Sequence, residues 1–101
     1  MLTAVVALVL LHGTVTIGPT TPVCRVGVPC DKPAAKVTLT FTRPGHVVRA
    51  VTDASGHYRV SLQAGTWNVR ANAGMYMKPA KIVVPQLRTV TRNFAIDTGI
   101  R

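Results

Sequence analysis

A short segment near the middle of the chain holds the three residue types of a serine-hydrolase triad. Asp53, Ser55 and His57 stand within five residues of one another. The members of such a triad come from separate elements that converge in the fold, so close spacing along the chain does not indicate one. Asp53 also opens the sequence Asp-Ala-Ser-Gly, in which the aspartate side chain bonds the backbone of a turn. We therefore predict a turn here, and no catalytic residues.

The remaining groups that do chemistry are few and scattered. The acidic residues are three aspartates: Asp31, Asp53 and Asp97. They are too few to predict a pair of catalytic carboxylates, and the glycines are not grouped in a phosphate-binding loop. Of the isolated histidines, His46 and His57 flank opposite ends of an expected strand about 20 Å long, which argues against a shared metal ion. We expect no enzymatic activity, no metal site and no cofactor.

The two cysteines stand close together in a segment rich in proline and glycine. Cys24 and Cys30 lie in PVCRVGVPCDKP, a composition typical of a loop. In an exported chain this arrangement predicts a disulfide, which would stabilise the fold by about 2 kcal/mol because it closes a small ring. Free thiols and a zinc site are the alternatives. Structural zinc needs four ligands, and the histidines lack the paired spacing of a zinc finger.

Positive charge dominates the composition. The 12 Lys and Arg outnumber the 3 acidic residues, which gives a net charge of +9 over 101 residues. Arg59 and Arg70 fall at outward positions of consecutive expected strands, and we expect them on one face of a hairpin. Such a face predicts attraction to an anionic cell-envelope polymer or glycan, with an ordinary solvated face as the alternative. Aromatic residues alternate to the other side, which argues against nucleic acid as a partner.

Apolar and polar residues alternate through most of the chain and predict the strands that would position these groups. In residues 36–42, for example, Val37, Leu39 and Phe41 alternate with threonines, the pattern of a half-buried strand. Strands are expected over 13–17, 36–42, 47–52, 57–63, 66–72, 81–84 and 88–96. About seven strands, no helical period and 48% hydrophobic residues predict an all-β, antiparallel β-sandwich as a single domain over residues 13–101.

The central turn and the two strands after it resemble a known family. The motif residues are Asp53, Gly56, Tyr58, Leu62, Gly65 and Trp67. They resemble the core signature of the carboxypeptidase regulatory-like domain, and the resemblance extends over about residues 13–96. It implies a prealbumin-like, transthyretin-type sandwich with Ig-like architecture. It also implies an accessory or binding module without catalytic residues. Independently of the family, the inward phase of Tyr58 and Trp67 predicts that both rings pack in the core.

The first 11 residues, MLTAVVALVLL, form an apolar run. The run is shorter than the 18 or so residues of a membrane span but matches the apolar region of a secretory signal. One interpretation is a signal or anchor remnant over residues 1–12, which would place the protein outside the cell or at its surface. Membrane contact would then occur only through this leader, if it is retained. The other interpretation is an apolar first strand, which Val9 and its neighbouring valines also suit.

Taken together, these features predict a non-enzymatic, extracytoplasmic module with a structural or binding role. Two alternatives remain. One is a carbohydrate-binding module of the starch-binding-like fold group, for which Tyr76 is the candidate exposed aromatic residue. The other is an accessory domain that docks on a secreted hydrolase or another secreted protein.

Overall fold

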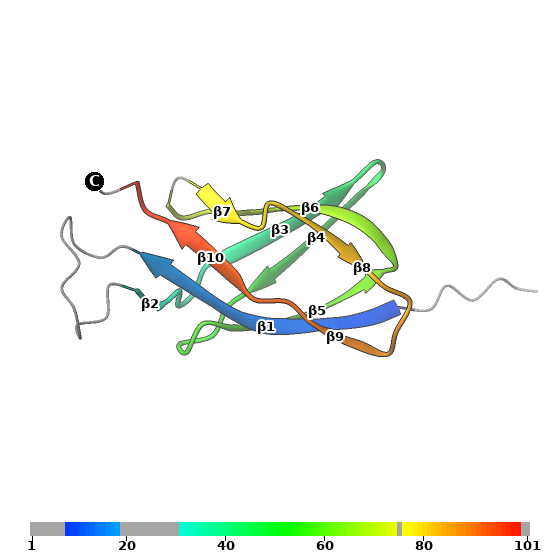
Figure 1. Ribbon diagram of the computed structural model, residues 1–101, viewed down its shortest axis with the longest axis horizontal. Helices are drawn as coiled ribbons and strands as arrows, with labels where there is room; N and C mark the ends of the chain where they lie inside the picture. Colours follow the sequence, from blue (N-terminus) through cyan, green and yellow to red (C-terminus); the bar gives the residue numbers. More distant parts are fainter. Residues whose placement is uncertain (1–7, 19–30, 75, 100–101) are drawn as a thin grey trace, which may run out of the picture.

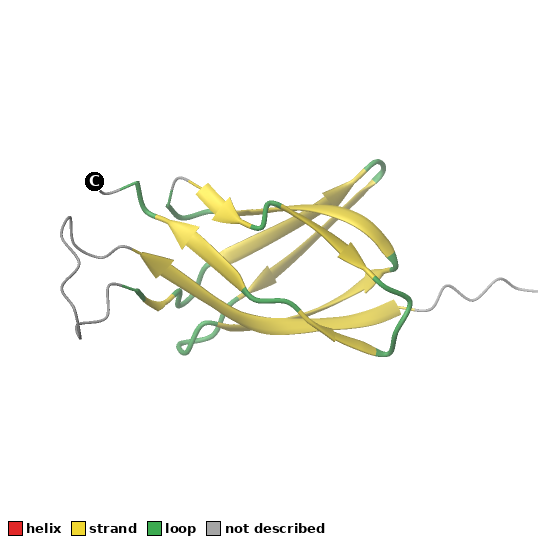
Figure 2. Ribbon diagram, in the orientation of Figure 1, coloured by secondary structure: helices red, strands yellow, loops and turns green. Residues whose placement is uncertain are grey.

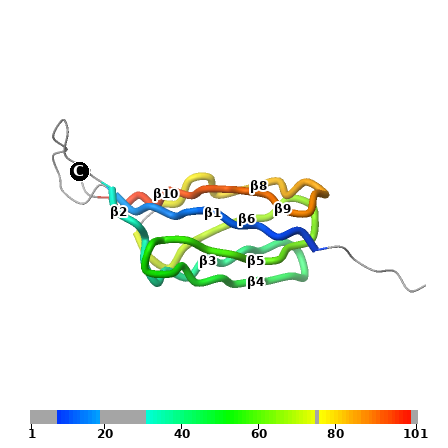
Figure 3. Tube along the Cα trace, turned by 90° about the horizontal axis from the view of Figure 1, so that it is seen from below, coloured from blue at the N-terminus to red at the C-terminus, as the bar shows by residue number. Residues whose placement is uncertain are grey.

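Alternating burial of side chains runs through almost every strand of the structure. The computed structural model describes residues 8–18, 31–74 and 76–99. The regular secondary structure of these residues consists of β-strands only (Figure 2). The strands form two sheets that pack face to face, with β1 and β10 in one layer and β3 and β4 in the other (Figures 1 and 3). The expectation of an all-β fold with two sheets is confirmed.

The smaller sheet has four strands in the order β4-β3-β6-β8, all antiparallel. Its members are β3 (Thr38–Arg43), β4 (His46–Val51), β6 (Gly65–Ala71) and β8 (Lys81–Val84). The inward positions carry buried apolar residues such as Phe41 and Trp67. The outward positions carry threonine, asparagine and basic residues together with the exposed valines Val47, Val51 and Val83. One face of this sheet therefore covers the core and the other meets solvent.

The larger sheet is organised around the eleven-residue strand β1 (Leu8–Gly18). Along one edge, β1 pairs antiparallel with β5 (His57–Gln63) and then with β2 (Lys32–Pro33). Along the other edge it pairs in parallel with β9 (Thr89–Thr91) and β10 (Phe94–Asp97), and β7 (Tyr76–Lys78) adds to β10. The sheet is therefore mixed, and the expectation of a wholly antiparallel sandwich is corrected by these two parallel pairings.

The described residues form ten strands rather than about seven. The short strands β2 and β7 lie in segments that were expected to be loops, and the last expected strand is divided into β9 and β10. The division occurs at Arg92 and Asn93, opposite Gly13. A Cβ atom on Gly13 would collide with the backbone carbonyl of Arg92, so glycine permits the close approach. The side chain of Asn93 takes over the pairing there, since its Oδ1 accepts a hydrogen bond from the backbone N–H of Thr14 at 3.0 Å.

The sandwich begins earlier in the chain than the expected boundary at residue 13. Strand β1 starts at Leu8, and Val9 and Leu11 are core residues with exposed fractions of 1% and 0%. Residues 8–12 therefore form part of the sandwich, as the interpretation of an apolar first strand expects. The earlier part of the proposed leader, residues 1–7, lies outside the described residues.

The chain crosses from one sheet to the other between β5 and β6. Strand β5 pairs with β1, whereas β6 pairs with β3 and β8. Gly65, with φ of +134°, stands at the crossing, in a backbone conformation that favours glycine. The expected hairpin between these two strands is wrong, and with it the expectation that Arg59 and Arg70 share one face.

Candidate functional site

The turn before β5 is held by the side chain of Asp53. Its Oδ1 accepts hydrogen bonds from the backbone N–H groups of Ser55 and His57 at 2.8 and 2.9 Å, and Oδ2 lies 3.7 Å from His57 Nδ1. The bond from the His57 backbone is the main cause that lowers the pKa of Asp53. Gly56 completes the turn with φ of +79°. The closely spaced Asp, Ser and His thus build a turn.

The two aromatic residues of the family-like motif are both buried, but in separate groups. Tyr58 packs against Phe41 and Phe94 with ring centroids 6.2 and 5.6 Å away. Its hydroxyl donates a hydrogen bond to the carbonyl of Arg92 at 2.6 Å. Within the described residues, the aromatic contacts of Tyr58 do not include Trp67. The two residues stand in different sheets because the chain crosses between β5 and β6.

Trp67 has an exposed fraction of 2% and lies at the end of the sandwich where β5 leads into β6. Its Nε1 donates to the carbonyl of Gln63 at 2.9 Å. The guanidinium of Arg43 lies 5.3 Å from the ring centroid, a cation–π distance, and His46 makes an edge contact at 6.3 Å. Trp67 is thus a buried residue with a satisfied donor, as expected from its inward phase. Leu62 is buried as well.

A hollow of about 280 Å³ lies between β6 and β7. It is lined by both Arg70 and Tyr76, which the sequence suggested separately as candidate ligand contacts. Arg70 projects outward from β6, and Tyr76, with an exposed fraction of 58%, opens β7. Gly74 lines the hollow between them; a Cβ atom there would collide with Ile96 of β10, so glycine lets this loop lie against the larger sheet. Lys78, two residues after Tyr76, falls on the same face of β7 by alternation.

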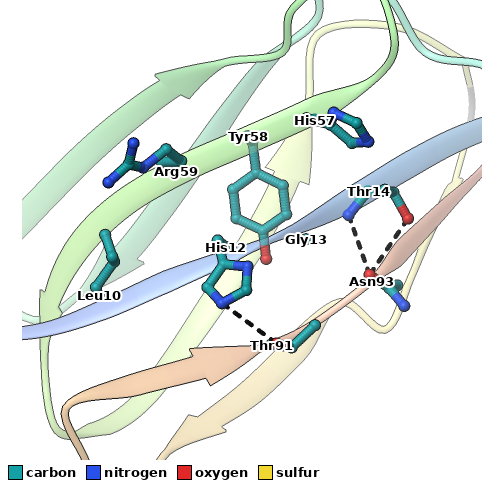
Figure 4. Close-up of a pocket in the computed structure, with 9 residues that line it drawn as sticks. All are labelled: Leu10, His12, Gly13, Thr14, His57, Tyr58, Arg59, Thr91 and Asn93. Carbon is teal, nitrogen blue, oxygen red and sulfur yellow. Dashed lines mark hydrogen bonds between the residues drawn. The ribbon is translucent and has the colours of Figure 1, made fainter.

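Arg59 lines a different depression, a groove of about 610 Å³ on the outer face of the larger sheet (Figure 4). The groove crosses β5, β1 and the junction of β9 with β10. Its polar lining residues are His12, Thr14, His57, Arg59, Thr91 and Asn93. Sequence reasoning did not assign His12 or Asn93 to a site, because one interpretation placed His12 in a leader and because the approach of Asn93 to β1 joins residues far apart in the sequence. The alternation of buried Val9 and Leu11 with Leu10 and His12 is the signal that identifies this segment as a strand with an outer face.

Three further features considered from the sequence are the disulfide, a metal site and a membrane span. Cys24 and Cys30 lie outside the described residues, so their disulfide stays a prediction. Within the described ranges no cluster of three or more His, Cys, Asp or Glu side chains is placed to hold a metal ion. No helix suited to crossing a membrane is found in the same part of the chain.

The chain was compared with protein-family models, with curated proteins and with solved structures, and none of the three comparisons gives a match.

Proposed function

We propose that the chain is a non-enzymatic, extracytoplasmic binding module of the carboxypeptidase regulatory-like type, and that its ligand is an anionic glycan. The two-sheet architecture and the turn built by Asp53 and Gly56 are compatible with that family. Within the proposal, the sandwich is of the prealbumin-like type and acts as a rigid support for binding residues on its surface.

The observation that carries the proposal is the hollow shared by Tyr76 and Arg70. An exposed aromatic ring offers a flat apolar surface on which the apolar face of a sugar ring packs. A guanidinium beside it forms paired, charge-assisted hydrogen bonds with a carboxylate or sulfate of the same sugar unit. The two groups together select an acidic sugar over a neutral one.

The charge distribution around the hollow supports the same ligand class. Across the outer face of the smaller sheet, the register places Arg49 and Arg70 on either side of Thr40. Lys81 stands opposite Asn68 in the adjacent part of the same face. Such a basic surface attracts a polyanion over about 8–10 Å at moderate ionic strength, and it steers the chain before the specific contacts form.

The experiment is retention of the full chain on immobilised polygalacturonate at pH 7.5, measured over a range of salt concentrations. We expect retention that weakens as salt rises. Arg70→Gln should weaken binding about tenfold, because it removes charge-assisted hydrogen bonds. Tyr76→Ala should weaken it about threefold or more. Arg59→Gln is the matched control, since it removes the same charge from the other sheet. Equal loss in the two arginine variants would show that net charge alone causes retention.

A further inference from the structure

The register of β1 and β5 places the basic side chains of the groove directly beside one another. His12 stands opposite Arg59, and Thr14 stands opposite His57. Residues opposite each other on antiparallel strands have Cβ atoms about 4.5–5.5 Å apart and side chains on the same face. Arg59 and the two histidines therefore extend from neighbouring positions on one face of the sheet, and all three line the groove.

Side chains from the other edge of β1 hold two of these residues in place (Figure 4). Thr91 Oγ1 lies 3.3 Å from His12 Nε2. Asn93 Oδ1 accepts from both the backbone N–H and the hydroxyl of Thr14, at 3.0 and 3.3 Å. Because the Asn93 carbonyl oxygen is committed to Thr14, the amide NH₂ of Asn93 remains as a donor at the rim. The groove thus offers hydrogen-bond donors from β1, from β5 and from the segment between β9 and β10.

The charges around the groove are mostly positive. Arg59 carries a permanent positive charge. The one carboxylate described in contact with these groups is Asp53, 3.7 Å from His57 Nδ1. Oδ1 of Asp53 accepts hydrogen bonds from backbone N–H groups of the turn. The positive charge of Lys36 also lowers the pKa of Asp53. On the β9 side, the guanidinium of Arg92 bonds the carbonyl of Thr91.

We propose that this groove is a second anion site, which binds a tetrahedral oxyanion, sulfate or phosphate, between Arg59, His12 and His57. A tetrahedral anion presents acceptors in several directions, and side chains from both β1 and β5 line the groove that would hold it. The site is separate from the hollow of Tyr76 and Arg70, since no residue given as lining one depression also lines the other. The bound group is either the free ion or the same group carried as an ester on a polymer.

The test follows the histidine ring signals of the full chain by NMR during a sulfate titration at constant ionic strength. Sulfate is the probe because it is tetrahedral and carries a fixed double negative charge. The signals of His12 and His57 should shift and saturate. His46 is the internal control, because it lies on β4 beside Trp67 in the other sheet.

Variants separate this site from general charge attraction and from the proposed glycan site. Arg59→Gln, an exposed position, should weaken sulfate binding about tenfold, whereas Arg70→Gln should leave it unchanged. Equal responses of all three histidines, or none beyond a chloride control, would overturn the proposal. A sulfated oligosaccharide that binds more tightly in an Arg59-dependent manner identifies the ester as the source, and equal affinity identifies the free ion. Polygalacturonate binding that survives Arg59→Gln tests the glycan site separately.

Discussion

Gly56 and Gly45 adopt the same backbone conformation in two turns of the sandwich, each with φ of +79°. Their surroundings differ. A Cβ atom on Gly56 would lie 2.5 Å from the carbonyl oxygen of Val15, whereas a Cβ atom on Gly45 would have no neighbour within 4 Å. The carbonyl of Gly56 also accepts the backbone N–H of Val15 at 2.8 Å, so the turn is tied to β1.

We predict that Gly56→Ala destabilises the fold more than Gly45→Ala. Both variants carry the cost of a positive φ, about 1–2 kcal/mol. Only Gly56→Ala adds a collision with rigid backbone, and its total should reach about 3 kcal/mol. Urea unfolding followed by Trp67 fluorescence measures both. Equal midpoints would mean that the turn does not lie against β1.

The buried hydroxyl of Tyr58 gives a pH dependence with a defined sign. Burial raises the pKa of Tyr58 above its ordinary value of 10.0, and the charge of Arg92 opposes the shift only in part. Above about pH 10 the unfolded chain loses this proton while the folded chain keeps it. The free energy of unfolding therefore falls as the pH rises from about 10 towards the folded-state pKa.

We predict that Tyr58→Phe is less stable than the wild type by about 1 kcal/mol at pH 7, because the Arg92 carbonyl loses its donor. This difference should shrink as the pH rises above about 10. Tyr76→Phe, at an exposed position, is the control and should show no such change. Chemical denaturation at several pH values measures the differences. A constant gap between wild type and Tyr58→Phe would contradict the burial of an uncharged hydroxyl.

At the scale of elements, β1 determines how the larger sheet is assembled. It pairs with β5 and β2 on one edge and with β9 and β10 on the other. Two of its buried side chains, Val9 and Leu11, come from the run that also resembles a secretory signal. Cleavage after residue 12 would remove half of the strand and with it much of the pairing to β5.

We predict that Leu11→Ala destabilises the protein by about 2–5 kcal/mol, the range for large-to-small changes in a core. Leu8→Ala is the matched control. It makes the same chemical change on the same strand at a position with an exposed fraction of 58%, and should change stability by less than about 0.5 kcal/mol. Thermal or urea unfolding compares the two. If Leu11→Ala were as stable as the control, residues 8–12 would not be part of the core.

The sequence predicted the elements better than their pairing. Alternation located strands such as those over 57–63 and 66–72, because burial of one face is a local pattern. It did not predict that these two strands enter different sheets. A turn at Gly65 permits either a hairpin or a crossing, and the choice depends on packing against β1 and β3. The turn at Asp53 was predictable because its hydrogen bonds are local. The contact of Tyr58 with Arg92 joins residues 34 positions apart, and no local pattern predicts it.

At the scale of the whole molecule, basic residues line two separate depressions. Arg70 and Tyr76 meet at the hollow between β6 and β7, and Arg59 meets two histidines across β1 and β5. The basic excess is therefore divided between separate surfaces rather than gathered on one hairpin. If both proposals hold, an extended anionic polymer and a small oxyanion would not compete for the same side chains.

The most direct test of the proposed function is a map of backbone amide shifts as a uronic acid oligosaccharide is added to the full chain. We predict that the largest shifts occur in residues 69–74 and 76–80, around Arg70 and Tyr76, and that they saturate. The same titration of Arg70→Gln should leave these amides nearly unmoved. Small shifts spread evenly over both sheets, or the largest shifts in the edge strand β4, would contradict binding at this hollow.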